Sequence, residues 1–250
     1  NFWVRQNGEI FRNPIRPLID NLDTIEFPDR DLLKRYRRMA HFPVKSVIAT
    51  RGCPYDCSYC YNYAFAQIYK GKGERVRRRS VDNVIAEIKT EYLKRPFNIV
   101  NFEDDIFILS EQWIKEFSIR YKKEIGLQFI CNIHANHVQE DAIYYLKQAG
   151  CISVVMGIES GDDFVRNKIL NKGTTRDKIV SACRIIKKYK IRLECENILG
   201  IPGVNLTSDL ETAKLNIICK PDYAASYIFQ PHPKTILSEV SKWKYGFSGN

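Results

Sequence analysis

Short runs of β-branched and apolar residues alternate along most of the chain with longer segments in which apolar residues recur every three or four positions. The short runs predict strands at residues 46–50, 98–102, 127–133, 152–158, 191–199 and 223–229. The longer segments predict helices at residues 81–93, 111–124, 138–148, 176–189 and 209–219. Strands that alternate with helices favour right-handed βαβ units and an α/β fold with a parallel sheet.

The predicted helix ends carry the residues that such ends favour. Gly126 and Gly150 follow two helices at C-cap positions. Residues that favour the N-cap stand before four helices, and they are Ser80, Asn136, Thr175 and Ser208. Periodicity alone does not choose between an open doubly wound sheet and a curled or closed barrel.

The chain divides into three parts. Residues 1–45 are polar and rich in turns, and we expect a linker with one short helix and no strand pairing. Residues 46–235 hold the alternating strands and helices of the core, and residues 236–250 begin a C-terminal extension. The first residue is Asn rather than Met, so we expect the chain to be part of a longer protein.

Composition narrows the class of protein. The 250 residues are 44% hydrophobic and 27% charged, an ordinary globular mixture with a net charge of +10. The sequence holds neither an apolar stretch long enough for a membrane span nor a secretion signal, and we expect a cytoplasmic protein. The basic segments 34–38 and 70–79 could attract RNA, but we favour a solvated surface because aromatic residues do not interleave with them.

Three of the eight cysteines form the strongest motif in the chain. Cys53, Cys57 and Cys60 follow the first predicted strand with the spacing C-x3-C-x2-C. Three thiolates on one loop can hold an iron–sulfur cluster and leave one iron open to a further ligand. A zinc loop closed by a distant ligand such as Cys131 or His134 is the alternative.

The remaining cysteines are scattered along the chain. A chain of this length does not need a disulfide framework. We expect them to be reduced, buried and apolar in character, and they are Cys131, Cys151, Cys183, Cys195 and Cys219.

The spacing of the clustered cysteines, their place after a first strand and the aromatic residue before the last of them resemble the radical S-adenosylmethionine (SAM) superfamily. The resemblance implies a partial (β/α)6 TIM barrel, preceded here by a short linker. It implies that Cys53, Cys57 and Cys60 hold a [4Fe–4S] cluster whose open iron binds the methionine part of SAM. Tyr59 would then lie against the adenine.

Two further segments resemble motifs of the same superfamily. The segment from Glu159 and Ser160 to Gly161 is similar to its G-x-E-S-G motif, which implies contacts to the SAM ribose and carboxylate, with Lys172 as a second carboxylate partner. Ile201 lies in a segment similar to the G-x-P-G turn, where the backbone approaches the adenine. An ordinary strand-to-helix turn is the alternative for the first segment.

The acidic segment at the end of the second strand resembles a variant found in cobalamin-binding radical SAM proteins. Glu103, Asp104 and Asp105 stand where the superfamily binds the SAM ammonium group, and the sequence leaves open which of them does so. A helix-entry acidic cluster is the alternative. Residues 77–80 and the linker at 22–33 also resemble this cobalamin-binding branch. The Asp-x-His-x-x-Gly cobalamin motif does not occur in the sequence, so the chain resembles the radical SAM core without a cobalamin domain.

Polar residues within two predicted strands are candidates for the barrel lumen. Glu194 and Glu196 alternate among apolar neighbours, and Asn132 and His134 end the third strand in the same way. A charged side chain in a strand that is buried on both faces needs a partner. The four residues therefore either contact substrate in the lumen or serve as satisfied structural polar groups.

The resemblance implies a specific chemistry. An external donor such as flavodoxin or ferredoxin would reduce the cluster, SAM would be cleaved to a 5′-deoxyadenosyl radical, and the radical would take hydrogen from a substrate that the sequence does not identify. In a full-length cobalamin-dependent relative the implied outcome is methylation or a rearrangement. An RNA-modifying methylthiotransferase, favoured by the basic segments, and a non-catalytic metal-binding module remain as alternatives.

Overall fold

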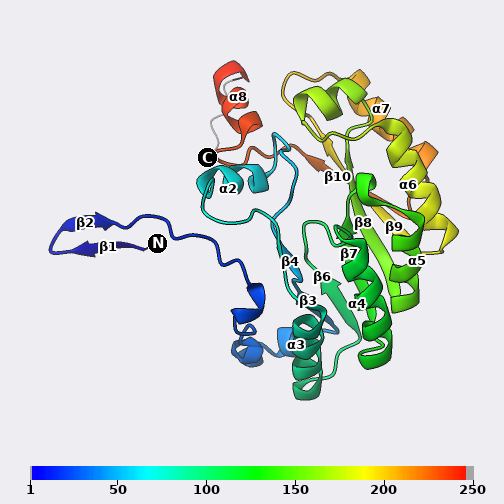
Figure 1. The fold of residues 1–250 in the computed structure, drawn as a ribbon. Coiled ribbons are helices and arrows are strands. Elements are labelled where there is room, and N and C mark those ends of the chain that lie inside the picture. Colours follow the sequence, from blue (N-terminus) through cyan, green and yellow to red (C-terminus); the bar gives the residue numbers. More distant parts are fainter. Residues whose placement is uncertain (1, 246–250) are drawn as a thin grey trace.

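Six parallel strands form the central sheet of the computed structural model, which describes residues 2–245 (Figure 1). The order across the sheet is β10, β9, β8, β7, β6 and β3, so that every strand lies beside its neighbour in the alternating sequence. All six predicted strands are present, as β3 (Val44–Val47), β6 (Ile99–Phe102), β7 (Gln128–Ile133), β8 (Cys151–Glu159), β9 (Arg192–Leu199) and β10 (Tyr223–Ile228).

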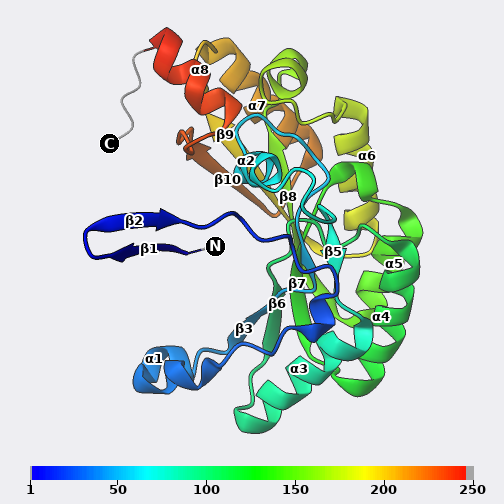
Figure 2. The same ribbon diagram turned by 60° about the vertical axis from the view of Figure 1, so that its left-hand side comes forward.

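This strand order resolves the ambiguity left by periodicity. Right-handed crossovers that always step in the same direction place every helix on the same face of the sheet. Figure 2 shows the helices on the convex side of a curved sheet, while the linker and α2 lie on the concave side. The two edge strands β3 and β10 do not pair with each other, so the barrel is open. The predicted partial (β/α)6 barrel is confirmed.

The helices between the strands follow the predicted pattern closely. They are α3 (Val81–Lys94), α4 (Glu111–Glu124), α5 (Glu140–Ala149), α6 (Arg176–Lys188) and α7 (Leu206–Cys219). Ser80 and Thr175 cap their helices by accepting bonds from the amides of Asn83 and Lys178, as predicted. Gly150 has a φ of 105° at the end of α5, and Gly126 has a φ of 68° just after α4.

Two predicted caps are wrong. Helix α7 begins three residues earlier than expected because Asn205, rather than Ser208, is its N-cap and accepts a bond from the Ser208 amide at 3.2 Å. Asn136 lies in a short 3-10 helix, Ala135–His137, ahead of α5, and its amide donates to His134 Nδ1 at 3.2 Å. Local hydrogen bonds of Asn side chains and His rings compete with capping at both sites.

The hydrophobic core lies between the sheet and the outer helices. Phe102 is fully buried and packs against Phe107, Phe117 and Phe129 with ring centroids 4.6–5.5 Å apart. Burying each such ring contributes about 2–3 kcal/mol relative to leaving it exposed. The five scattered cysteines are free and buried in the described structure, as predicted.

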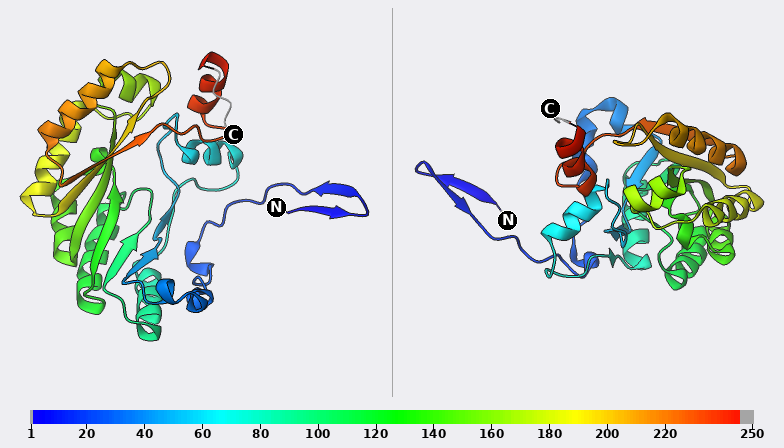
Figure 3. Two further views of the ribbon diagram at one scale, coloured as in Figure 1. Left: turned by 180° about the vertical axis from the view of Figure 1, so that it is seen from behind. Right: turned by 90° about the horizontal axis from the view of Figure 1, so that it is seen from above.

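The N-terminal segment differs from its prediction. Strands β1 (Trp3–Gln6) and β2 (Glu9–Arg12) pair as an antiparallel hairpin that projects from the body of the molecule (Figure 3). The turn is Asn7-Gly8, in which both residues have a positive φ, as the two-residue turns of hairpins require. Every residue of both strands is exposed, so no buried face marked them as strands in the sequence.

Shorter elements complete the concave side. The linker contains the 3-10 helices Leu22–Thr24 and Arg30–Arg35 and helix α1 (Arg37–Ala40). Strands β4 (Thr50–Arg51) and β5 (Arg77–Arg78) pair antiparallel, and α2 (Tyr61–Ile68) and α8 (Ile236–Tyr245) lie near each other above them (Figure 1). Within residues 2–245, each helix is too short or too polar to span a bilayer.

Candidate active site at the carboxyl ends of the strands

The cysteine loop, residues 52–60, begins directly after β4. Gly52 has a φ of 92°, and a Cβ at this position would lie 2.0 Å from the carbonyl oxygen of Arg75. Only glycine permits both the conformation and this contact. Arg75 also binds the loop itself, donating to the Tyr55 carbonyl oxygen and pairing with Asp56 at 2.7 Å. The first half of the loop is therefore fixed to the segment that precedes β5.

Ser58, which lies between two of the cysteines, fixes the second half of the loop. Its amide donates to the carbonyl oxygen of Leu170 at 2.9 Å, and its hydroxyl donates to that of Ile169 at 2.5 Å. Its own carbonyl oxygen accepts from the amide of Leu237 at 2.9 Å. The loop is thus bound both to the segment after β8 and to helix α8, although these are far apart in sequence.

The three thiols of the loop lie within electrostatic range of one another. Burial raises the pKa of Cys53 to about 11, with further contributions from Asp105, Cys57 and Cys60. Burial also raises the pKa of Cys57 and of Cys60. Thiols whose pKa is raised in this way need a strong electron-pair acceptor in order to bind as thiolates, and iron in a cluster is such an acceptor.

The arrangement of these donors fits a cluster better than a single ion. Within residues 2–245, no group of three or more His, Cys, Asp or Glu side chains converges as the ligands of one metal ion do. A structural zinc site needs four ligands around one centre. A cubane cluster binds each thiolate through a different iron, so its ligands are more widely separated. The chemistry of three thiols on one loop suits an iron–sulfur cluster.

A buried ion pair lies at the end of β8, beside the loop. Lys172 Nζ donates to Glu159 Oε1 at 2.8 Å, and the two residues are 5% and 8% exposed. Burial opposes the charge of Lys172, but Glu159 and Cys57 outweigh it and raise the pKa of the lysine. Gly157 makes room for the pair, because a Cβ there would lie 2.1 Å from Glu159 Oε1. Glu159 has a φ of 66°, a strained conformation typical of functional sites.

Three other predicted SAM contacts lie at the same end of the sheet as this ion pair. Burial and the charge of Glu159 raise the pKa of Tyr59 well above its ordinary value. The Tyr59 ring packs against a small apolar cluster that includes Ile201 and Leu170. Ser160 is buried, and its hydroxyl accepts a bond from the amide of Asp162 at 3.2 Å. The structure therefore brings Tyr59, Glu159, Ser160, Lys172 and Ile201 to one end of the sheet.

The three acidic residues after β6 have different environments. Asp104 is fully buried and accepts a bond from the Ala49 amide at 3.0 Å, and burial raises its pKa to about 6. Glu103 is exposed and accepts from Ser46 Oγ at 3.0 Å. Asp105 is exposed and accepts from Asn62 Nδ2 at 2.6 Å. Only Glu103 and Asp105 present a carboxylate to the concave side, while Asp104 ties β6 to the turn before β4.

The predicted lumen residues fall into two groups. Glu194 and Glu196 are half-buried, and burial and then Glu159 raise the pKa of Glu196. Asn132 donates to the Asp104 carbonyl oxygen at 3.1 Å. His134 is buried and stacks on Tyr55 with ring centroids 4.1 Å apart, and burial and the charge of Lys172 lower its pKa to about 3. His134 is therefore a neutral ring behind the cysteine loop.

Two residues that sequence reasoning missed support the site. Arg166 is fully buried in the π-helix Val165–Ile169 and donates to the carbonyl oxygens of Ser160 and Thr174, each at 2.8 Å. His137 Nε2 lies 3.0 Å from the Tyr55 hydroxyl. No pattern distinguished either of them, since a lone Arg or His becomes informative only once its burial is known.

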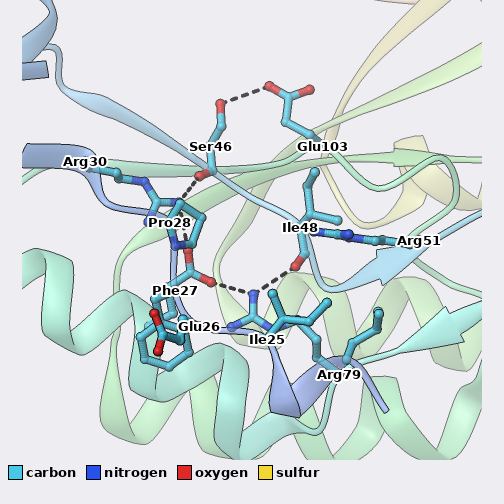
Figure 4. A pocket seen from close by; sticks show the side chains of 12 residues that line it. Ile25, Glu26, Phe27, Pro28, Arg30, Ser46, Ile48, Arg51, Arg79 and Glu103 are labelled. Carbon is cyan, nitrogen blue, oxygen red and sulfur yellow. Dashed lines mark hydrogen bonds and ion pairs between the residues drawn. The ribbon is translucent and has the colours of Figure 1, made fainter. Parts of the chain in front are cut away.

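Two adjoining cavities open beside the acidic residues and share Ile48, Arg51 and Glu103 as lining. The smaller, of about 270 Å³, lies between the linker and β3. Figure 4 shows Arg30 and Arg79 beneath it and the bonded Ser46 and Glu103 at its far edge. Both arginines pair with the buried Glu87, which anchors the linker to α3. The larger cavity, of about 520 Å³, reaches Gly52 and Asp105 at the cysteine loop.

Comparison with known proteins identifies a family and several relatives of this chain. A family model described as the radical SAM superfamily matches residues 47–215. An uncharacterized methyltransferase of Pyrococcus horikoshii is 29% identical over 98% of this chain and 51% of its own length. The anaerobic magnesium-protoporphyrin IX monomethyl ester cyclase of Rubrivivax gelatinosus is 25% identical over 92% of this chain and 41% of its own length.

Solved structures show the same fold. The radical SAM methyltransferase TsrM from Kitasatospora setae, with cobalamin and a [4Fe–4S] cluster bound, superposes with a TM-score of 0.72. It is 17% identical, and the match covers 98% of this chain and 47% of that one. The chain therefore spans about half the length, or less, of the relatives that it matches.

Proposed function

The chain belongs to the radical SAM superfamily, and from this premise we propose that its cysteine loop holds a [4Fe–4S] cluster at which SAM is cleaved. Members of the superfamily are enzymes that use this cluster and SAM. When bound and reduced, the cluster supplies the electron that splits SAM into methionine and a 5′-deoxyadenosyl radical. The observation that carries the proposal is the position of Cys53, Cys57 and Cys60, which lie together between the acidic end of β6 and the Glu159–Lys172 pair.

We assign the SAM-binding roles from the environment of each side chain. The exposed Glu103 and Asp105 are suited to the ammonium group, because their carboxylates have only neutral donors as partners. Asp104 is less suited to this role, because it is fully buried and one of its oxygens accepts a bond from the Ala49 amide. The loop aromatic Tyr59, packed near Ile201, is suited to the adenine.

The buried end of β8 completes the assignment. Glu159 can accept a bond from a ribose hydroxyl through the oxygen that Lys172 does not engage. Ser160 and Lys172 are suited to the SAM carboxylate because both offer donors there. We assign four residues to the lumen: Asn132, His134, Glu194 and Glu196. Burial and then the charge of Glu159 raise the pKa of the half-buried Glu196, so the two carboxylates lie within electrostatic range of each other.

We extend the proposal to the full-length protein from the relatives. The matched proteins include methyltransferases and a cyclase, and the TsrM structure contains cobalamin. On this basis the full-length protein uses cobalamin for methyl transfer or a rearrangement, with a flavodoxin or ferredoxin as electron donor. The eight free cysteines favour the reducing cytoplasm.

Cluster reconstitution tests the central assignment. Anaerobic addition of iron and sulfide should load about four irons and four sulfides and give a brown chromophore. Cys57→Ala should abolish the absorption band, whereas Cys183→Ala, which changes a buried cysteine of α6, should retain it. An unchanged spectrum for Cys57→Ala would contradict the cluster assignment.

SAM cleavage tests the chemistry separately. Dithionite reduction of the loaded wild-type chain with SAM should release methionine and 5′-deoxyadenosine in equal amounts. An intact cluster that never releases these products would contradict the assigned reaction, while Cys183→Ala serves again as the matched control.

A further inference from the structure

The larger cavity has walls of two different characters. Helix α2 contributes Tyr61 and Phe65, and its C-cap residue Tyr69 follows at helical spacing, with successive ring centroids 6.5 and 4.6 Å apart. The linker adds Pro17, Leu18 and Ile19. A wall of adjacent aromatic rings and apolar side chains suits the flat or apolar body of an organic molecule.

Two arginines form the opposite, charged part of the lining. Arg51 and Arg77 lie directly across from each other in the β4–β5 pair, so their side chains share one face. Like charges in this position repel each other, and Arg51 contributes to lowering the pKa of Arg77 after burial. An anion between the two guanidinium groups would remove this repulsion.

Arg77 is held in position but forms no close ion pair with a carboxylate of the described structure. It is 8% exposed, and one guanidinium nitrogen donates to the Ile19 carbonyl oxygen at 2.9 Å. Its Nε is buried and has no hydrogen-bond partner in the described structure. Within residues 2–245, neither Arg77 nor Arg51 lies within ion-pair distance of a carboxylate. A buried guanidinium that has an unbonded nitrogen and no close carboxylate is costly, so an arriving anion gains from this site.

Several other arginines of the described residues have close carboxylate partners. Carboxylate partners within 4.0 Å are found for Arg30, Arg75, Arg79, Arg95, Arg120 and Arg166. In the part of the chain that the structure describes, Arg51 and Arg77 lack such a close contact, although Asp20 raises the pKa of Arg77 through its charge and Glu103 and Asp105 also line the cavity. The bidentate geometry of guanidinium groups matches carboxylates and phosphates.

We propose that this cavity binds a substrate that carries one carboxylate or phosphate group on an apolar, ring-containing body. The anionic group pairs with Arg51 and Arg77, and the body packs along Tyr61, Phe65 and Tyr69. The cavity reaches Gly52 and Asp105, so the bound body lies next to the cysteine loop. Its role as substrate rests on the proposed function, whereas the binding itself does not.

Three matched naphthalene probes test the site in the anaerobically reconstituted chain. Fluorescence titration compares 2-naphthoate, 2-naphthyl phosphate and the uncharged 2-naphthylmethanol. At least one anion should bind about tenfold or more tightly than the alcohol, as expected for a charge-assisted contact. The stronger anion identifies the group as carboxylate or phosphate.

Variants link the binding to the two arginines. Arg51→Gln should weaken binding of the better anion about tenfold and leave the alcohol unaffected. Arg51→Lys should retain more affinity for the anion than Arg51→Gln. Arg184→Gln, which changes an exposed arginine of α6, should leave the affinity for the anion unchanged. Arg77→Lys keeps a buried positive charge and should weaken the anion less than Arg77→Gln, with circular dichroism as the check on folding.

Several results would overturn the proposal. These are equal binding of anions and alcohol, unchanged anion binding in Arg51→Gln, and an equal loss of SAM binding in that variant, which would assign the arginines to the SAM carboxylate. Failure of the proposed function has a different signature, because anion binding would still depend on Arg51 while no 5′-deoxyadenosine appears.

Discussion

Glu159 and Asp104 are both buried carboxylates at strand ends beside the cysteine loop, and the structure holds them in different ways. Glu159 pairs with the ammonium group of Lys172 at 2.8 Å. Asp104 has a backbone amide, that of Ala49, as its partner at 3.0 Å, and burial raises its pKa to about 6. The first carboxylate is paired with a cation, whereas burial of the second favours its neutral form.

This difference separates a binding group from a structural one. Glu159 and Lys172 form a charged unit in which either partner can exchange contacts with a polar ligand. Asp104 fixes β6 to the turn before β4 and positions its neighbours Glu103 and Asp105. Both side chains carry a carboxylate, so the partner that each one binds in the folded structure decides its role.

The largest expected effect comes from breaking the ion pair. Lys172→Met leaves Glu159 buried without a cation and should lower the free energy of unfolding by about 3–5 kcal/mol. Urea denaturation of the chain without cofactors measures this. Lys168→Met, an exposed lysine of the same segment, should change stability by less than about 0.5 kcal/mol. Adding Glu159→Gln to Lys172→Met should recover most of the loss, and no recovery would show that packing rather than charge is involved.

The next largest effect on stability is expected at Gly157, which leaves space for the Glu159–Lys172 ion pair. Gly157→Ala places a methyl group where Glu159 Oε1 now lies, at 2.1 Å, and Lys172 Nζ lies 2.9 Å away. The pair must move, and we expect a loss of about 3 kcal/mol in urea denaturation. In a Glu159→Ala background the same change should cost much less. Equal losses in both backgrounds would place the clash elsewhere.

The pH dependence of Asp104 gives a smaller effect with a defined sign. Its folded-state pKa of about 6 lies above the ordinary 3.8, so the folded state binds the proton more tightly than the unfolded state. The cost of its charge is fully present above pH 6 and is relieved as the pH falls toward 4. Relative to Asp104→Asn, wild type should gain about 2 kcal/mol between pH 7 and pH 4.5. Urea denaturation at the two pH values measures this, and a constant difference would contradict the buried charge.

The smallest change in stability is expected at Glu103. This side chain is exposed, so Glu103→Gln should alter the free energy of unfolding by less than about 0.5 kcal/mol. If it holds the SAM ammonium, equilibrium dialysis with the reconstituted chain should show SAM binding weakened about tenfold. Asp105→Asn is the matched comparison, and the variant with the greater loss identifies the ammonium ligand. If Glu103→Gln lost as much stability as Lys172→Met, the distinction between the exposed carboxylate and the buried ion pair would be wrong.

The sequence predicted the sheet well because each βαβ unit carries its own signal. Strand and helix periods differ, and each helix of the barrel has an apolar face that packs on the sheet. The hairpin of β1 and β2 was missed because both of its faces are exposed, although Asn7-Gly8 is a strong turn signal. The caps at Ser208 and Asn136 were misplaced because neighbouring Asn and His groups form the competing bonds.

The sequence indicated which residues belong to the candidate site, but it did not indicate which of them contact each other. Cysteine spacing identifies the loop, but the pairing of Glu159 with Lys172 joins positions that only the fold brings together. The room left by Gly157 depends on side chains that cross over it. The unpaired state of Arg77 depends on which carboxylates are absent nearby, and no local pattern records that.

The bonds of Ser58 have a consequence for the order of events during synthesis. The cysteine loop leaves the ribosome long before its partners Leu170 and Leu237, which bind Ser58 from later segments. At about 5–20 residues per second, the wait for Leu237 is on the order of ten seconds or more. The nascent loop therefore first lacks both contacts, then gains the one to Leu170, and remains without the one to Leu237 until that residue has been synthesised. The contact with α8 that completes the fixing of the cysteine loop is thus among the last that the chain can form.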